Sequence, residues 1–361
     1  MPTCSAAALT EFASRIIRAT GADDDVADEV GRHLVRSNLS GHDSHGVLRL
    51  QQYVTQVDEA QIAPSARPEV VTDNGATGLV DAHRSFGHFS TTFALDWALD
   101  RARRHGISSV AVRRSAHIGR LGEYTERAAD QGLVALLTVG AAGKGVGWMP
   151  PFGGRHRFVG ANPWSIAVPG EGRSFVFDGS MTNIARGKVD VAHARGAQLP
   201  PGCIVDRDGQ PAQDPEAFFA DGSLMPLGGE VAGHKGYALG LASALIGGLA
   251  MIGDPDPTLI GGDLFWGPSG STSFLAGVFL ILIDPGRFGP AGDYRTSVDG
   301  LLADAEATEP ASEATSVQVP GDFERRNRER LTAAGITLPQ ATWNGLEALA
   351  ERFGVPTPDS V

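Results

Sequence analysis

The sequence predicts an α/β protein, because strand-like and helix-like segments alternate through the middle of the chain. The strand-like segments are short and apolar, several of them rich in β-branched residues, and they cover residues 78–82, 107–112, 133–139, 165–168, 175–177 and 278–283. The helix-like segments between them are longer, and they cover residues 89–104, 122–131 and 237–251. This alternation predicts a substantial buried sheet with helices packed on it.

Helical segments flank this alternating region. Residues 9–58 have helical periodicity, with a first apolar stripe that ends at Gly21 and a second helix that begins after Asp23. Prolines then interrupt the pattern, and we place a domain boundary near Gly75. The segment Ser40–Tyr53 is expected to begin the third helix of this region, ahead of the prolines.

The C-terminal part of the chain returns to helix. Residues 301–316 are mostly Ala, Glu, Asp, Thr and Ser, which is typical of a linker, and helical patterns follow at 323–334 and 343–353. We expect these helices to pack back onto the N-terminal ones. The predicted division is a helical domain from residues 1–75 and 310–361, and an α/β domain from residues 76–309.

Composition limits the class of protein. The 361 residues are 42% hydrophobic and 20% charged, as in a globular protein, and the formal net charge of −12 comes without any long basic run. These features argue against a nucleic acid or an anionic membrane as the partner, but not against a small anionic ligand held by local arginines. Two cysteines without a Cys-x-x-Cys pair, and an N-terminus without a basic leader, lead us to expect no signal peptide and a cytoplasmic location.

Four side chains with chemical potential lie close together in the segment Ser40–Tyr53: His42, His45, Arg49 and Tyr53. If Ser44 caps a helix, His45 and Arg49 form an i,i+4 pair and Tyr53 lies further along nearly the same face. Such a face would carry a group that titrates near neutrality, a guanidinium fork that grips carboxylates, and a phenol. It is costly to bury without a ligand. The apolar residues between, Val47, Leu48, Leu50 and Val54, are left for packing.

Three further features are open to more than one interpretation. His117 follows a strand and precedes a helix, where α/β proteins place ligands, but a histidine that only ties down the loop is the commoner case. Asp178 ends a strand, so it can cap a helix, bind a ribose hydroxyl or hold a histidine. Lys235 stands at the start of an apolar helix, where a cation opposes the helix dipole unless an anion is present, although a lysine extending into solvent is as common.

Two familiar kinds of site are not evident. No Gly-x-Gly-x-x-Gly stands between a strand and a helix, so a dinucleotide would bind outside the Rossmann pattern. His42-Asp43-x-His45 offers metal ligands, but no third ligand lies nearby in the sequence, and we expect no metal. A metal-dependent hydrolase that uses His42, His45 and His117 stays open as an alternative, as does a binding protein without catalysis.

Taken together, the motifs resemble the malate/L-lactate dehydrogenase family, whose members include ureidoglycolate dehydrogenase, diketogulonate reductase, sulfolactate dehydrogenase and cyclic-imine carboxylate reductase. The resemblance covers nearly the whole chain. The matching segments, in family order, are residues 41–46 with Arg49 and Tyr53, 117–119, 152–154, 162–163, Asp178 with Ser180, 187–188, 227–229, 235–237, 284–285 and 320–321.

The resemblance implies a non-Rossmann nicotinamide-binding domain with a large mixed sheet, joined to a helical domain, usually in a homodimer. It implies hydride transfer between NAD or NADP and C2 of a 2-oxo or 2-imino carboxylate. Carried onto this sequence, His45 is the acid/base, Arg49 the carboxylate clamp and His117 a second acid/base or substrate-orienting residue. The substrate would contact Ser44, Arg49, Tyr53 and His117, and the cofactor would contact Asn162, Ser174, Phe177, Asp178, Gly179, Ser180, His234, Lys235 and Gly321.

The physical chemistry agrees with this expectation. Reducing a carbonyl places negative charge on its oxygen, so a proton donor is needed within about 3 Å, and a histidine serves in both directions. Arg49 can hold the carboxylate bidentately and so fix the face of C2 that meets the nicotinamide. If the substrate is a cyclic imine, His45 would protonate nitrogen instead. The chain departs from the family pattern at residues 140–145, where Gly and Ala replace a Thr-Asn pair in what we expect to be a longer loop, and this favours a larger substrate.

Overall fold

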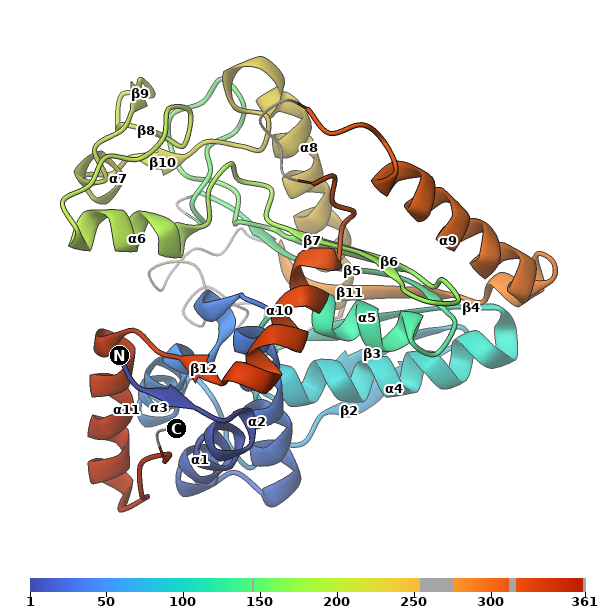
Figure 1. The fold of residues 1–361 in the computed structure, drawn as a ribbon, viewed down its shortest axis with the longest axis horizontal. Helices are drawn as coiled ribbons and strands as arrows, with labels where there is room; N and C mark the ends of the chain where they lie inside the picture. Colours follow the sequence, from blue (N-terminus) through green and yellow to red (C-terminus); the bar gives the residue numbers. More distant parts are fainter. Residues whose placement is uncertain (145, 254–274, 312–315, 360–361) are drawn as a thin grey trace.

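A seven-stranded mixed sheet forms the centre of the computed structural model, which describes residues 1–144, 146–253, 275–311 and 316–359 (Figure 1). Its strands lie in the order β2-β3-β4-β11-β5-β6-β7. Their bounds are Glu69–Asp73 (β2), Thr77–Asp81 (β3), Ile107–Arg113 (β4), Val134–Ala142 (β5), Trp164–Val168 (β6), Phe175–Gly179 (β7) and Leu275–Ile283 (β11). Only β3 and β4 pair in parallel among these described strands. The predicted α/β class is confirmed.

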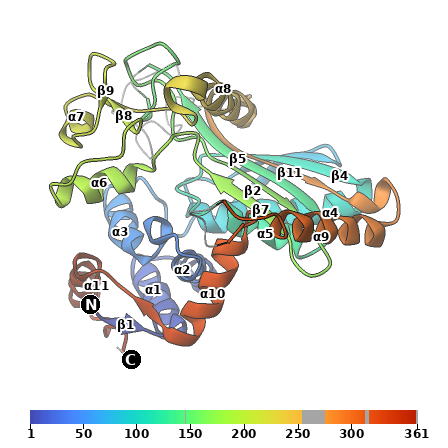
Figure 2. The ribbon, with the colours of Figure 1, turned by 45° about the horizontal axis from the view of Figure 1, so that its top comes forward.

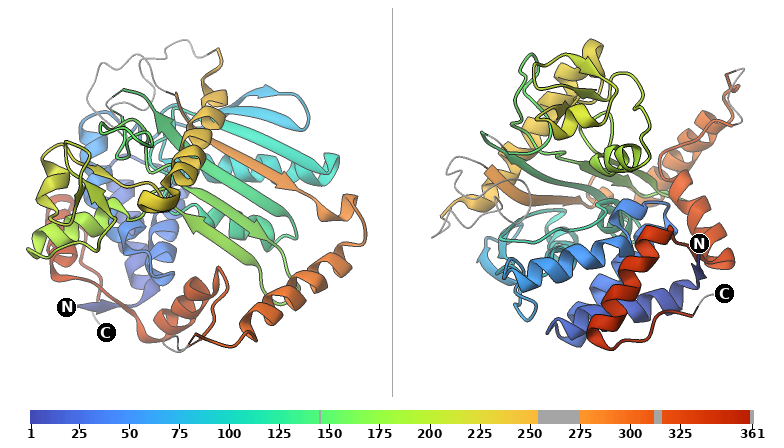
Figure 3. Two further views of the ribbon diagram at one scale, coloured as in Figure 1. Left: turned by 90° about the horizontal axis from the view of Figure 1, so that it is seen from above. Right: turned by 90° about the vertical axis from the view of Figure 1, so that its left-hand side faces the viewer.

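Helices cover both faces of this sheet. Helices α4 (Gly87–His105) and α5 (Gly122–Ala129) lie behind it in the left view of Figure 3, and α8 (Gly229–Gly247) crosses the front. Small residues allow α8 to approach closely: a Cβ on Gly247 would fall 2.6 Å from the carbonyl oxygen of Gly277 in β11. Gly140 lies on β5, not in the expected loop, and a Cβ there would fall 2.4 Å from Ser243 of α8. The helix fills that space, so Gly140 gives no room to a larger substrate.

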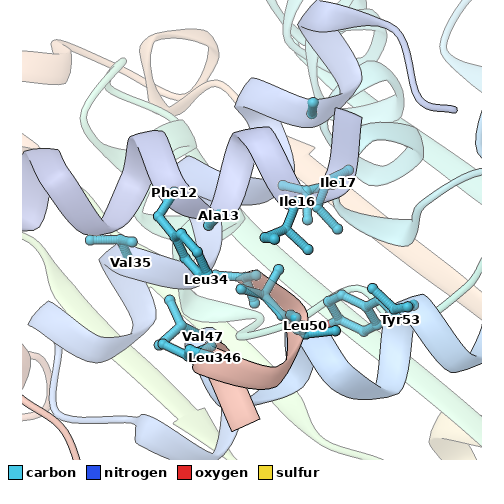
Figure 4. Packing of buried hydrophobic residues seen from close by; sticks show 14 of the residues in the cluster. Phe12, Ala13, Ile16, Ile17, Leu34, Val35, Val47, Leu50, Tyr53 and Leu346 are labelled. Atoms are coloured by element: carbon cyan, nitrogen blue, oxygen red, sulfur yellow. The ribbon is translucent and has the colours of Figure 1, made fainter. Parts of the chain in front are cut away.

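The N- and C-terminal helices form a layer of their own. It contains α1 (Ala6–Ala19), α2 (Asp24–Leu39), α3 (Leu50–Asp58), α10 (Asp322–Ala334) and α11 (Gln340–Phe353). Figure 4 shows Leu346 of α11 against Val47 and Leu50 in the core of this layer. Burial of one such leucine stabilises the fold by about 1.5–3 kcal/mol. The chain ends also pair directly as β1 (Thr3–Cys4) and β12 (Ile336–Thr337). The C-terminal helices therefore do pack back onto the N-terminal ones.

A small third unit lies beside α8 and was not foreseen. It contains α6 (Arg186–Ala194), α7 (Glu216–Phe219) and a three-stranded sheet of β8 (Ile204–Val205), β9 (Pro211–Ala212) and β10 (Ser223–Leu224) (Figure 2). Strands of two residues leave almost no periodic signal in a sequence.

Three expectations about element bounds and one about packing need correction. Helix α8 begins at Gly229, well before the expected start at Tyr237. Helix α9 (Ala291–Glu306) extends into the expected linker 301–316, of which residues 312–315 lie outside the described part of the chain. The sheet begins at Glu69, ahead of the boundary placed near Gly75. Leu48, which was expected to pack with Val47 and Leu50, is 37% exposed and does not belong to the buried core of the helical layer. Within the described residues, no helix has both the length and the apolar character to cross a bilayer.

Candidate active site

The segment that carries His45 and Arg49 is not the continuous helix that the spacing predicts. Two 3-10 turns, Asp43–His45 and Val47–Arg49, come before α3, and extended Gly46 separates them. The cause is Asn38 of α2, whose Oδ1 accepts a hydrogen bond from the Val47 N–H at 2.9 Å and whose Nδ2 donates to Asp43 at 2.6 Å. Ser44 therefore caps no helix, and that prediction was wrong.

The two histidines of interest nevertheless meet. The rings of His45 and His117 stack with centroids 5.3 Å apart and planes within 8° of parallel. His117 comes from the loop between β4 and α5, so the site joins the helical layer to an edge of the sheet. Both histidines are partly exposed as residues, although Nδ1 of His45 is buried, whereas Tyr53 behind them is fully buried and its hydroxyl lies 2.7 Å from Nδ1 of His117. The structure thus brings His117 to His45 and Tyr53, which lie 64 or more residues earlier in the sequence.

Both imidazoles are neutral at neutral pH. Burial, reinforced by the positive charge of Arg49, lowers the pKa of His45 to about 3. Burial is also the main reason that the pKa of His117 lies well below its ordinary value, with His45 and Arg49 adding to the effect. A neutral imidazole offers one N–H donor and one lone pair, so each ring can either give or take a hydrogen bond from a ligand.

The hydrogen-bond acceptors of the Arg49 side chain among the described residues are neutral. The Arg49 Nε donates to the Ser44 carbonyl oxygen at 2.6 Å and its Nη1 donates to Oε1 of Gln52 at 2.6 Å. Both acceptors are neutral, and no carboxylate of the described residues forms an ion pair with Arg49. The guanidinium is partly exposed and close enough to affect both histidines. This is the environment that an anionic ligand group would complete.

Helix α6 packs near the segment that contains Ser44, His45 and Arg49. Its Gly187 lies against Ser44, where a Cβ would be 3.7 Å from the Ser44 Cβ. Figure 1 shows α6 facing α3 and the segment before it. The first turn of α6 also carries Arg186 and Lys188, which add positive charge on that side.

Sequence reasoning missed two buried histidines. His88 in the first turn of α4 and His33 in α2 are both 0% exposed, and their rings meet edge to face with centroids 4.6 Å apart. Nε2 of His88 lies 3.4 Å from the Tyr53 hydroxyl. His33 stands beside Val30 and Leu34 at a core position of its helix, and a polar residue at such a position was the available signal.

Gly119 is required beneath these two rings. Its φ is +74°, and a Cβ would fall 2.5 Å from Nε2 of His33 and 2.8 Å from Nε2 of His88. The His-x-Gly spacing therefore has a packing reason: only glycine lets the loop with His117 cross so close to the buried imidazoles.

The comparisons with known proteins agree on one family. The model of the malate/L-lactate dehydrogenase family matches residues 4–347. The chain is 30% identical over 354 residues to hydroxycarboxylate dehydrogenase B of Escherichia coli K12, which covers 96% of the chain and 93% of that protein. A solved structure of a putative malate/lactate dehydrogenase from E. coli superposes with a TM-score of 0.86 at 29% identity, covering 98% of this chain and 96% of that one.

The chain belongs to the malate/L-lactate dehydrogenase family. It is an enzyme of the dehydrogenase and reductase class, and dehydrogenases of this family generally use a nicotinamide cofactor. A further relative is the Δ1-pyrroline-2-carboxylate/Δ1-piperideine-2-carboxylate reductase of Pseudomonas syringae pv. tomato, which is 32% identical over 357 residues, 96% of each protein.

Nothing supports the alternative of a metal-dependent hydrolase in this dehydrogenase family. Nε2 of His42 lies 2.8 Å from Oε1 of Glu324 in α10, so this imidazole joins two helical segments. In the part of the chain that the structure describes, no three His, Cys, Asp or Glu residues are arranged to hold a metal ion.

The residues expected to line the nicotinamide cofactor fall into separate groups. Gly321 lies beside Ser174 at the start of β7, where the Val176 N–H donates to the Pro320 carbonyl oxygen at 3.1 Å. Ser180 lies at the other end of β7, and the Leu227 N–H donates to Met181 at 2.9 Å, which places this end beside the start of α8. Phe177 and Gly179 occupy β7 itself between these two ends.

Two of these residues have structural duties in this family member. Oδ2 of Asp178 accepts a hydrogen bond from the Gly122 N–H at 2.7 Å and so caps α5, the first of the three roles expected for it, while burial raises the pKa of this carboxyl group. The amide of Asn162 is fully buried and bonds to Ala141 N, Ala141 O and Gly240 O.

His234 and Lys235 are exposed, and they lie in the second turn of α8. The argument that Lys235 opposes the dipole at a helix N-terminus therefore does not hold. No carboxylate among the described residues forms an ion pair with Lys235, so its charge is available to an anionic group.

Proposed function

We propose that this enzyme transfers hydride between a nicotinamide cofactor and C2 of a small 2-oxo or 2-hydroxy carboxylate. One observation carries the proposal: Arg49, which has no carboxylate partner in the described part of the chain, lies beside the stacked neutral rings of His45 and His117. A carboxylate held on Arg49 would bring the adjacent C2 oxygen to these imidazoles.

His45 serves as the acid/base in this proposal. In the oxidation direction its neutral ring accepts the proton that leaves the hydroxyl group as hydride leaves C2. Arg49 lowers the pKa of His45, so a substrate carboxylate that neutralises Arg49 removes that effect. Binding of a 2-oxo acid would therefore favour proton uptake by His45, which prepares it to protonate the oxygen in the reverse direction. His117 orients the same oxygen.

The cofactor would be held along β7 and the start of α8. The residues fit such a group, because exposed Lys235 and His234 supply a cation and a ring near the Ser180 end of β7, and Gly321 with Ser174 lines the other end. The bound nicotinamide supplies the hydride; the protein supplies position and charge. A sheet in which one described strand pair is parallel differs from the parallel sheet of a Rossmann unit, and this supports a non-Rossmann mode of binding.

A cyclic imine carboxylate is the second candidate substrate. It is favoured by the 32% identity to a protein whose name describes reduction of Δ1-pyrroline- and Δ1-piperideine-2-carboxylate. The same clamp and the same proton donor would serve, with the proton delivered to nitrogen.

We also propose that the enzyme works as a homodimer through the outer face of α8. Apolar residues at alternating intervals of four and three form a stripe along the last turns of α8 and past its end: Ala238, Ala242 and Leu245 lie on the helix, and Leu249 and Ile252 follow its last residue, Gly247. Leu245 is 56% exposed and Ile252 is 69% exposed, and residues 237–252 carry no charge. A stripe with this spacing pairs well with a helix of the same kind, and a second copy supplies one.

The test is a panel of 2-oxo acids and cyclic imine carboxylates, each with NADH and with NADPH, followed by the absorbance of the reduced nicotinamide. His45→Ala should abolish turnover while NADH or NADPH still raises the melting temperature. Arg49→Lys should raise KM for the carboxylate about tenfold or more, because lysine cannot form the fork. Arg155→Lys, an exposed arginine elsewhere, is the matched control. Normal kinetics for both site variants would refute the assignment.

A further inference from the structure

The buried histidines behind the site form a continuous series with His117. The Tyr53 hydroxyl lies 2.7 Å from Nδ1 of His117 and 3.4 Å from Nε2 of His88. The ring of His88 in turn meets that of His33. Tyr53, His88 and His33 are each 1% exposed or less, so these contacts are shielded from solvent.

His33 fixes the backbone of the loop that carries His117. Its Nε2 accepts a hydrogen bond from the Arg120 N–H at 3.1 Å, and Arg120 follows His117 by three residues. The accepting Nε2 carries no proton, so His33 has its proton on Nδ1. The two buried histidines therefore hold His117 in two ways, one through the loop and one through Tyr53.

The protons on the second path can be assigned. Burial raises the pKa of Tyr53, so the phenol is neutral and has one proton to donate. It donates either to His117 or to His88, and the other imidazole must then donate its N–H to the phenol oxygen. The two distances distinguish these arrangements. The 2.7 Å contact with Nδ1 of His117 has the length of an O–H···N hydrogen bond, whereas the 3.4 Å contact with Nε2 of His88 is long for one, so the phenolic proton belongs on the His117 side.

The remaining arrangement is that Nε2–H of His88 donates to Tyr53, and Tyr53 donates to Nδ1 of His117. The 2.7 Å contact then holds the phenolic proton, as a short O–H···N bond should. Nδ1 of His117 is an acceptor, so the proton of this neutral ring sits on Nε2.

We propose that His88 is a positioning residue that acts through Tyr53 to keep His117 in the tautomer with its proton on Nε2. This inference rests on the proposed function, because it gives His117 the task of donating a hydrogen bond to the C2 oxygen or nitrogen of the substrate. His45 is then the base of the stacked pair and His117 is the donor. His45 and His117 thus have different roles because Tyr53 and His88 fix the tautomer of His117 alone.

The tautomer is measured directly by long-range 1H–15N correlation on protein labelled with 15N-histidine, with His117 assigned from a His117→Gln variant. The expected result for the wild type is a protonated Nε2 and an unprotonated Nδ1 on His117. In His88→Phe and in Tyr53→Phe, the His117 signals should move toward a mixture of both tautomers. In His88→Gln they should stay close to wild type, because the Gln side-chain N–H can donate to the Tyr53 oxygen. His105→Gln, an exposed histidine, is the control.

Kinetics give the second measurement. His88→Phe should lower kcat about tenfold with little change in KM, which is less than the roughly 10²–10⁴-fold that an acid/base group itself contributes because His88 acts only through Tyr53, and His88→Gln should recover most of the loss. A wild-type His117 protonated on Nδ1, or a tautomer unchanged in both His88→Phe and Tyr53→Phe, would overturn the proposal. The tautomer reading needs no substrate, so it can fail while the dehydrogenase activity stands, and the activity can fail while the tautomer is as expected.

Discussion

Replacing His88 by glutamine should make the protein less sensitive to acid. His88 is fully buried, and burial lowers the pKa of its imidazole to about 3. In the unfolded chain the same group titrates near 6.5. Below pH 6.5 the His88 imidazole takes up a proton in the unfolded chain but stays neutral in the folded protein. The neutral His88 therefore costs no stability above pH 6.5, and the free energy of unfolding falls as the pH is lowered from 6.5 toward 3.

The size of the effect follows from this difference. Each pH unit between the two pKa values costs about 1.4 kcal/mol, so lowering the pH from 6.5 to 5 removes about 2 kcal/mol through His88 alone. His33, His45 and His117, whose pKa values are also lowered by burial, add to the total loss of the wild type. They remain in the variant, so the difference between the two proteins isolates His88.

Urea denaturation at a series of pH values from 8 to 5 measures this difference. Wild type should lose about 2 kcal/mol more than His88→Gln between pH 6.5 and pH 5, whatever the variant costs at pH 8. His105→Gln should follow the wild type, because an exposed imidazole is solvated in both states. Parallel curves for wild type and His88→Gln would show that His88 takes up its proton in the folded protein as readily as in the unfolded chain.

Three other perturbations test the frame around the site. Glu123→Gln should cost about 1–2 kcal/mol in urea denaturation, because it removes the buried charge that Arg32 and Arg36 share at 2.7 Å, while each arginine keeps a second carboxylate, Glu29 or Glu126; an equal loss in the exposed Glu11→Gln would contradict this. Gly119→Ala should lower both the melting temperature and kcat, since its Cβ would fall between two imidazoles at a φ of +74°; unchanged values would refute that packing. Leu245→Glu should convert a dimer to a monomer in light scattering, whereas Val71→Glu should not; a dimer that survives Leu245→Glu would exclude the α8 face.

The sheet was predictable because each long strand is an apolar run that can be recognised in the sequence by itself. Apolar runs such as residues 107–112 and 278–283 stand out against polar surroundings, and the structure places β4 and β11 there with small changes at the ends. The wrong start of α8 has a local cause: Gly228 and Gly229 both have positive φ, yet α8 begins at Gly229, and seven further residues separate it from the apolar run that suggested the helix.

The site was predictable in its residues but not in its backbone. His45, Arg49 and Tyr53 share a face in an ideal helix, and they do end near one another, but the turns that place them are set by Asn38 from another helix. A side chain that competes for backbone N–H groups overrides local spacing, and one sequence does not reveal such a competitor. His33 and His88 were missed for a related reason, since their role depends on a contact with Tyr53 and on a loop that crosses Gly119.

The junction of the two layers explains why so much charge lies near a site that needs neutral histidines. Glu123 at the start of α5 accepts hydrogen bonds from Arg32 and Arg36 of α2, and these contacts fix the helical layer on the sheet layer beside the His117 loop. The same arginine charge reaches the buried rings, and Arg32 helps to lower the pKa of both His33 and His88. Burial is the larger cause of the lowered pKa of both histidines, and Arg32 adds to it, so the residue that joins α2 to α5 also favours the neutral form of the rings behind the site.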